Sequence, residues 1–256
     1  MGRIRNISLG VLAACLLTGA SYSVKAGVEN PGRVKRAVYE QLYSTQLRWP
    51  WANSTEKLMA FEKLYHVLIN RDPYSSATLD KMLPYGRLGT VRNKQFIETK
   101  KREMHVSLSF AFGQNEDLEI RMTALDKLYN AMDYGIDHEA VDNCLEKLFG
   151  ILDRTQYNLV LINKIYDLLS DTIANKAFGG DTEASMHGRN RKIYGRLLDD
   201  AANETFDDKR RILAAAIYAR ITAYDIEKTE LIEALVKRVE DTRNGSKILR
   251  NAGIKE

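Results

Sequence analysis

The sequence predicts an all-α protein of about nine or ten helices. Apolar residues recur every three or four positions along nearly the whole chain after residue 26, which is the spacing of one face of an α-helix. No stretch shows the sustained apolar-polar alternation, bounded by turn residues, that is typical of a β-hairpin. The composition, 45% hydrophobic with 16 Gly, 4 Pro and 2 Cys in 256 residues, is that of a globular protein and excludes fibrous, disordered and disulfide-stapled classes.

The N-terminus has the pattern of a secretory signal peptide. Arg3 and Arg5 precede an uncharged apolar run that is shorter than the roughly 20 residues of a membrane span, and Ala26 supplies a small residue for cleavage. We expect residues 1–26 to be removed, which leaves a single all-helical domain over 27–256 in the periplasm or secreted from the cell. An uncleaved N-terminal anchor is the alternative.

A second interpretation of this segment depends on a cysteine. The tetrapeptide Leu12-Ala13-Ala14-Cys15 resembles the lipobox of bacterial lipoproteins, and this resemblance implies a lipidated N-terminus at Cys15. The apolar run continues past Cys15, however, where lipoproteins usually turn polar. Lipidation therefore stands as the alternative to ordinary cleavage. The other cysteine, Cys144, is expected to be buried on a helix face.

Two helices are predicted at the start of the mature chain. Apolar residues spaced by about one turn define a helix over 34–47 and a second over 58–68. Ser54 or Thr55 is expected to cap the second helix, with Glu56 in its first turn, where the positive end of the helix dipole favours an acid.

Both tryptophans fall in the turn between these helices. Trp49 and Trp51 flank Pro50, which cannot continue a helix. Their rigid aromatic rings are suited to anchor a partner protein. The alternative is that they pack over the ends of the first two helices.

Prolines and glycines interrupt the next segment. Pro73 and Pro84 bound a short predicted helix. Gly86 and Gly89 predict a loop that leads into a longer helix over 96–112.

Apolar stripes predict five further helices, over residues 115–132, 137–152, 157–173, 212–224 and 228–240. The helix over 157–173 has little polar face and is expected to be central, and the alanine-rich helix over 212–224 is also expected to be interior. The last helix is amphipathic and belongs on a surface. Residues 179–191 are polar and contain glycine, which predicts a flexible loop and a candidate binding element.

A weak internal repeat links the predicted helices. Residues 58–65 match residues 122–129 at an offset of 64, and a Lys-apolar-Tyr step recurs at 164–166 and 192–194. Such helix-turn-helix pairs resemble α-solenoid repeats of the HEAT type, although the spacing is uneven. The sequence leaves two architectures open: an irregular HEAT-like stack of helical hairpins or a multi-helix bundle.

Charge is balanced overall but uneven along the chain. Removing residues 1–26 takes away three bases and no acid, so the formal net charge falls from +4 to +1 and gives no case for a nucleic-acid partner. Acids dominate over 116–146 and bases over 189–211, either as solvated helix faces or as a docking surface for a partner of complementary charge. A first basic stretch, a candidate partner-binding surface, contains Arg87, Arg92, Lys94, Lys100, Lys101 and Arg102.

Motifs for catalysis and for metal binding are missing from the sequence. The four histidines are far apart, and the one dense polar set, residues 137–142, suits a helix N-terminus better than a metal site. There is no Gly-x-Ser-x-Gly and no glycine-rich phosphate loop. We therefore expect no metal and no cofactor.

These observations lead to a functional hypothesis. We expect an exported, non-catalytic helical protein of the bacterial envelope that acts as a protein-binding scaffold or as a subunit of an envelope complex. Its partner is another envelope protein, and it contacts the membrane only if Cys15 is lipidated. The alternative is an all-α, glycan-cleaving enzyme that acts on the cell wall through a buried Glu or Asp.

Overall fold

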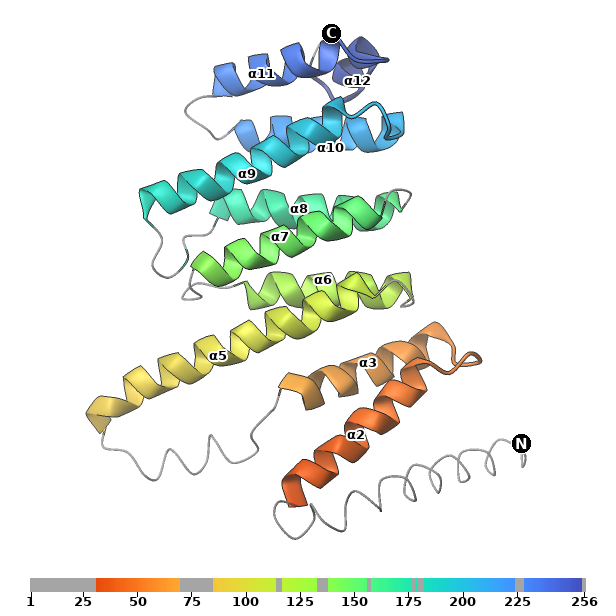
Figure 1. The fold of residues 1–256 in the computed structure, drawn as a ribbon, viewed down its shortest axis with the longest axis vertical. Coiled ribbons are helices and arrows are strands. Elements are labelled where there is room, and N and C mark those ends of the chain that lie inside the picture. The colour runs from red at the N-terminus through yellow and green to blue at the C-terminus, as the bar shows by residue number, and fades with distance from the viewer. Residues whose placement is uncertain are drawn as a thin grey trace. The chain divides into compact units, whose positions relative to one another are not determined.

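Ten α-helices account for most of the residues that the computed structural model describes, which are 31–69, 85–113, 117–132, 138–155, 158–175, 178, 182–223 and 228–254 (Figure 1). No strand occurs within these ranges, which confirms the predicted all-α class. The chain divides into two compact units between Arg102 and Glu103, inside helix α5, whereas the sequence predicts a single domain. The predicted signal peptide and Cys15 lie outside the described residues.

The first unit contains the helical hairpin α2 (Pro31–Leu47) and α3 (Ser54–Ile69). Asn53 caps α3: its Oδ1 accepts from the Glu56 N–H at 2.9 Å, and its own N–H donates to Glu56 Oε2 at 3.1 Å. The predicted cap at Ser54 or Thr55 is therefore wrong by one or two residues, because Ser54 is already helical.

Helix α5 (Tyr85–Phe112) begins earlier than predicted. Gly86 and Gly89, predicted to form a loop, lie inside this helix. A glycine costs a helix only about 1 kcal/mol relative to alanine, so two glycines do not prevent it from extending. The short helix predicted between Pro73 and Pro84 lies outside the described residues.

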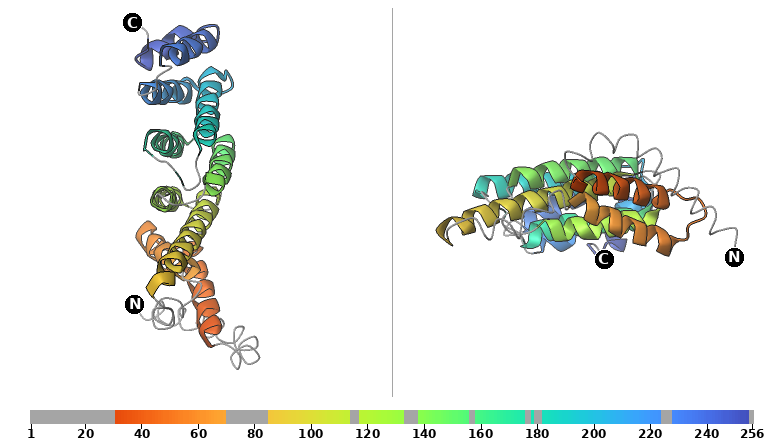
Figure 2. Two further views of the ribbon diagram at one scale, coloured as in Figure 1. Left: turned by 90° about the vertical axis from the view of Figure 1, so that its left-hand side faces the viewer. Right: turned by 90° about the horizontal axis from the view of Figure 1, so that it is seen from below.

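The second unit is a stack of helical hairpins in two layers. Its helices after α5 are α6 (Leu118–Ala131), α7 (His138–Arg154), α8 (Leu159–Asn175), α9 (Glu183–Ala202), α10 (Asp208–Thr222), α11 (Lys228–Glu240) and α12 (Gly245–Asn251). Helices α6, α8, α10 and α12 contact one another in succession and form what we call the second-helix layer; α7, α9 and α11 form the first-helix layer (Figure 2). The sequence leaves open a stack of helical hairpins or a multi-helix bundle, and this unit is a stack.

Burial within the stack follows the predicted pattern. Leu161, Ile162, Ile165 and Tyr166 of α8 are fully buried, as expected for a central helix. Helix α10 is interior as well, and α11 buries only two residues and exposes its charged side chains, as predicted. Helix α12 was not predicted, since seven residues are too few to show a helical period.

Helix α9 replaces most of the loop predicted over 179–191. It begins at Glu183, after a capping box in which the Ser185 N–H donates to Thr182 Oγ1 at 3.1 Å and the Thr182 N–H donates to Ser185 Oγ at 2.8 Å. Residues 183–191 are therefore helical, and 179–181 lie outside the described residues. The prediction failed because the first turns of α9 are mostly exposed and carry no apolar stripe.

An arginine clamp recurs in two hairpins and was not predicted. Arg121, at the start of α6, donates from Nε to the carbonyl of Ala111 at 3.0 Å, and Arg211, at the start of α10, donates from Nε to the carbonyl of Ala201 at 3.0 Å. In both hairpins the arginine ties the second helix to the last turn of the first, where carbonyls lack helical partners.

Candidate functional site

The turn between α2 and α3 brings both tryptophans together. The Trp49 N–H donates to the Gln46 carbonyl at 3.3 Å, and the Ala52 N–H donates to the Trp49 carbonyl at 3.2 Å, which folds the chain back on itself. The ring centroids of Trp49 and Trp51 are 5.9 Å apart and tilted by 39°. That separation is typical of aromatic pairs in contact.

These rings form one side of a cavity that we call the aromatic groove. It has a volume of about 700 Å³. Its lining comprises Gln46, Trp49, Trp51, Ala52, Glu56, Met59, Ala60 and Lys63. The Trp51 side chain is 70% exposed and that of Met59 is 55% exposed, so Trp51 does not pack over the helix ends; Trp49 is half-buried.

Four of the lining residues come from a single stripe of α3. Glu56, Met59, Ala60 and Lys63 are spaced by three and four residues and therefore share one helix face. The apolar stripe that predicts this helix lies on its neighbouring face, so these lining residues were not predicted. The available signal was the helical spacing of Met59 and Ala60 from Glu56 and Lys63, which places all four on one face.

The charged groups at the groove are held by neighbouring residues. Glu56 is tied to the backbone of Asn53 through the capping box, and the Lys63 ammonium lies 5.7 Å from the centroid of the Tyr43 ring. The lining thus combines aromatic and apolar side chains with the polar side chains of Gln46, Glu56 and Lys63. Ligand and partner sites commonly have this character.

The described end of the predicted basic stretch lies at the C-terminal end of α3. Arg102 Nη1 donates to the carbonyl of Ile69, the last residue of α3, at 3.2 Å. Helix α3 has 16 residues and is about 24 Å long, and the tryptophans lie before its first residue. The structure therefore does not bring the tryptophans and the end of the basic stretch into one site.

The remaining bases of that stretch lie on α5. Lys100 and Lys101 are half-buried. Arg87, Arg92 and Lys94 fall within the helix, and the structure describes their backbone but not their side chains.

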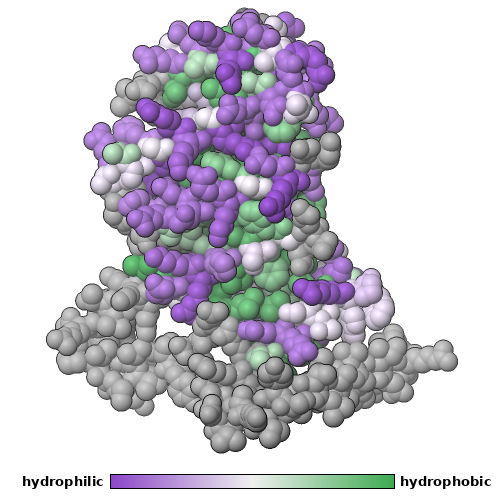
Figure 3. Space-filling model, viewed as in Figure 1, coloured by the Kyte–Doolittle hydropathy of each residue, from purple (hydrophilic) through white to green (hydrophobic). Residues whose placement is uncertain are grey.

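Ion pairs between successive hairpins use part of the charge that the sequence concentrates over 116–146 and 189–211. In the described part of the second unit, each of these pairs has its acid on the earlier helix and its base on the later one. The pairs, with N–O distances in parentheses, are Asp126–Lys164, Asp142–Arg189 (3.9 Å), Glu146–Lys192 (2.9 Å), Asp153–Arg196 (2.7 Å), Asp167–Arg220 (2.8 Å), Asp199–Arg238 (3.6 Å) and Asp208–Lys247 (3.7 Å). Figure 3 shows the hydrophilic side chains that cover α7 and α9 on the face of the first-helix layer.

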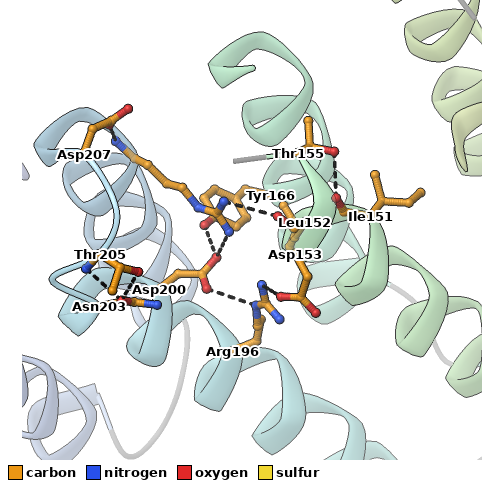
Figure 4. A network of polar contacts seen from close by, with 11 residues as sticks. Ile151, Leu152, Asp153, Thr155, Tyr166, Arg196, Asp200, Asn203, Thr205 and Asp207 are labelled. Atoms are coloured by element: carbon orange, nitrogen blue, oxygen red, sulfur yellow. Dashed lines mark hydrogen bonds and ion pairs between the residues drawn. The ribbon is translucent and has the colours of Figure 1, made fainter. Parts of the chain in front are cut away.

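A buried polar network lies inside the stack (Figure 4). The carboxylate of Asp200, 3% exposed, pairs with Arg196 Nε at 3.1 Å and Arg210 Nη2 at 2.9 Å and accepts from the hydroxyl of Tyr166. Arg210 also donates to the carbonyl of Leu152 at 3.2 Å. The network joins α7, α8, α9 and α10, and it explains why part of the second basic stretch is not on the surface.

This network bears on the enzyme alternative. Asp200 is the one carboxylate that is buried among the described residues; its Oδ2 accepts from Tyr166 and Arg210, and its Oδ1 forms an ion pair with Arg196. Burial, together with the neighbouring Asp200 charge, raises the pKa of the Tyr166 hydroxyl. A carboxylate held in this way stabilises the stack; a general acid needs room for its substrate.

Neither a metal centre nor a membrane span is seen in the described parts of the chain. No three His, Cys, Asp or Glu side chains gather there in a way that would hold a metal ion. None of the helices in the same ranges has the length and apolar character needed to cross a bilayer.

Comparison with known proteins adds no relative: the chain matches no protein family, no curated protein and no solved structure. Its class is therefore defined by the fold and the aromatic groove. It is an all-α protein whose second unit stacks helical hairpins and whose first unit carries an aromatic groove.

Proposed function

We propose that this protein is an exported, non-catalytic binding protein of the bacterial envelope, which holds another envelope protein through the aromatic groove. The observation that carries the proposal is the exposure of Trp51 and Met59 at a groove of about 700 Å³. Large aromatic side chains that project from rigid turns are frequent anchors of protein interfaces. Leaving them in water without a partner has no structural benefit.

The surrounding residues support a macromolecular partner. The groove opens beside a turn whose backbone is fixed by hydrogen bonds and by the capping box of α3, so the rings are held before a partner arrives. Such preorganisation lowers the entropy cost of association. The scaffold role also fits stacked helical hairpins, which provide long surfaces for contact.

Site-specific photocrosslinking in the source bacterium tests the binding role. A photoreactive amino acid at position 59, which lines the groove, should crosslink a discrete protein, and Trp51→Ala should abolish the product while Trp51→Phe retains it. The same photoreactive residue at the exposed position Asn143 of α7 is the control. Absence of a product from position 59, or the same product from position 143, would contradict the proposal.

Export is tested separately by mass spectrometry of the mature N-terminus after cell fractionation. We expect a chain that begins at Gly27 in the periplasmic fraction or the medium. An acylated chain that begins at Cys15 would instead identify a lipid-anchored form. An intact Met1 in the cytoplasm would overturn the envelope location.

A further inference from the structure

A second groove lies on the second-helix layer of the other unit, where the first turns of α8 and α10 meet α6. It has a volume of about 450 Å³ and we call it the α8 groove. Its lining comprises Met122, Leu159, Val160, Asn163, Lys164, Lys209 and Leu213. Three successive hairpins contribute to it, so it exists only in the stacked form of the chain.

The floor of the α8 groove is apolar and open to water. Val160 is 57% exposed, whereas its neighbours Leu161 and Ile162 are fully buried. Met122, Leu159 and Leu213 are half-buried around it. Apolar side chains of an incoming segment would remove this surface from water, which favours binding.

The charge of the lining is positive. Lys164 and Lys209 line the groove, and no carboxylate does. Lys164 is paired on one side with Asp126 of α6, whereas Lys209 is exposed at the start of α10. Complementary charge favours an acidic occupant, which the two ammonium groups would draw to the groove edge.

The dimensions favour a short peptide segment. Packed helices lie about 8–10 Å apart, so a groove that runs from α6 across α8 to α10 spans roughly 16–20 Å. An extended chain rises about 3.3 Å per residue, and about six residues cover that length. Alternate residues of an extended segment point to opposite sides, which allows apolar residues to face the floor while acids reach the lysines.

We propose that the α8 groove binds an acidic, amphipathic segment of a partner protein, with its apolar side chains on Val160 and Leu213 and its carboxylates toward Lys209 and Lys164. This site is separate from the aromatic groove in residues and in structural unit. It does not rest on the proposed function, since either groove can bind its occupant without the other.

Fluorescence anisotropy with three synthetic peptides tests the proposal on the full mature chain. The probes are a labelled twelve-residue peptide of alternating Glu and Leu, the same peptide with Gln for Glu, and the same peptide with Lys for Glu. We expect the Glu peptide to bind at least tenfold more tightly than the Gln peptide, the Lys peptide to bind least, and the preference to shrink as salt is raised. Equal affinities, or no binding of the Glu peptide, would overturn the proposal.

Variants locate the binding on the surface. Lys209→Glu should weaken binding of the Glu peptide at least tenfold. Val160→Ser should weaken binding of the Glu and Gln peptides alike, because it removes an apolar side chain from the floor of the groove. Both positions are exposed, so circular dichroism should show unchanged folding. Two variants serve as controls. Lys228→Glu makes the same change at the exposed first residue of α11, and Trp51→Ala alters the aromatic groove. Each should change the affinity for the Glu peptide less than twofold. An equal loss in either of these controls would overturn the assignment to this groove.

Discussion

Asp200 Oδ2 and Arg210 Nη2 lie 2.9 Å apart while both side chains are almost entirely buried. The two residues belong to the last turn of α9 and the first turn of α10, and Arg210 also holds the carbonyl of Leu152 in α7. Its guanidinium lies 3.7 Å from the centroid of the Phe206 ring. One ion pair therefore closes a hairpin and fastens it to the hairpin before it.

Removal of the Asp200 charge should be costly. Asp200→Asn leaves Arg210 and Arg196 without their buried counter-charge, and loss of one partner from a buried pair costs about 3–5 kcal/mol. Urea unfolding measures the change in free energy of unfolding. The neighbouring Asp199→Asn removes an exposed ion pair and should cost less than about 1 kcal/mol; similar losses in the two variants would contradict the role given to Asp200.

Cys144 should make the protein less stable at alkaline pH. Burial raises the pKa of its thiol from 9.0 to about 12, with a smaller opposing effect of Lys147. Above pH 9 the unfolded chain loses this proton while the folded chain keeps it, so stability is full below pH 9 and falls by up to about 1.4 kcal/mol per pH unit until about pH 12.

Two measurements check this expectation. Urea unfolding at pH 7 and pH 10 should show a larger loss of stability in the natural protein than in Cys144→Ala. A thiol reagent at pH 8 should label Cys144 only after denaturation, because the residue is 2% exposed. Rapid labelling of the native protein would show that the helix face around Cys144 opens readily.

Two glycines should respond oppositely to alanine. A Cβ at Gly245 would lie 2.1 Å from the carbonyl oxygen of Val239 and 2.7 Å from that of Glu240, so Gly245→Ala must displace the α11–α12 turn at a cost of about 1–3 kcal/mol. Gly188 in α9 has no neighbour within 4 Å of the same position, and Gly188→Ala should stabilise by about 0.5–1 kcal/mol. Thermal unfolding measures whether each variant is more or less stable than the natural protein. A more stable Gly245→Ala variant would contradict the close contacts at this position.

Arg211 should hold the end of the stack. Its guanidinium donates to the carbonyls of Ala201 at 3.0 Å and Arg243 at 2.6 Å and to the hydroxyl of Thr242, so Arg211→Met removes three contacts of a charged donor, at about 3 kcal/mol. Hydrogen exchange should accelerate in α11 and α12 and stay unchanged in α6 and α8. Arg220→Met, which breaks a half-exposed ion pair, is the control, and uniform acceleration would contradict local release.

Periodicity predicted the helices well because it reports which face of a segment is apolar. It placed α8 and α10 in the interior and the tryptophans of the first unit in one turn. It failed where the apolar face is weak or short, as at the start of α9 and in α12. It also could not find the partners of Arg210 and Arg211, since pairs tens of residues apart leave no period in the sequence. The groove residues Met59 and Lys63 were missed for a different reason: they lie on the face of α3 beside its apolar stripe.

The order of acids and bases between successive helices gives each hairpin two unlike sides. A hairpin can meet its neighbour with opposite charges in contact only in the native orientation; turned over, it would set carboxylate against carboxylate. The pairing thus specifies the direction in which the hairpins add, apart from any stability that it contributes. A chain that ended after α10 would expose Asp199 and Asp208 without their bases, and its tip would repel another such tip.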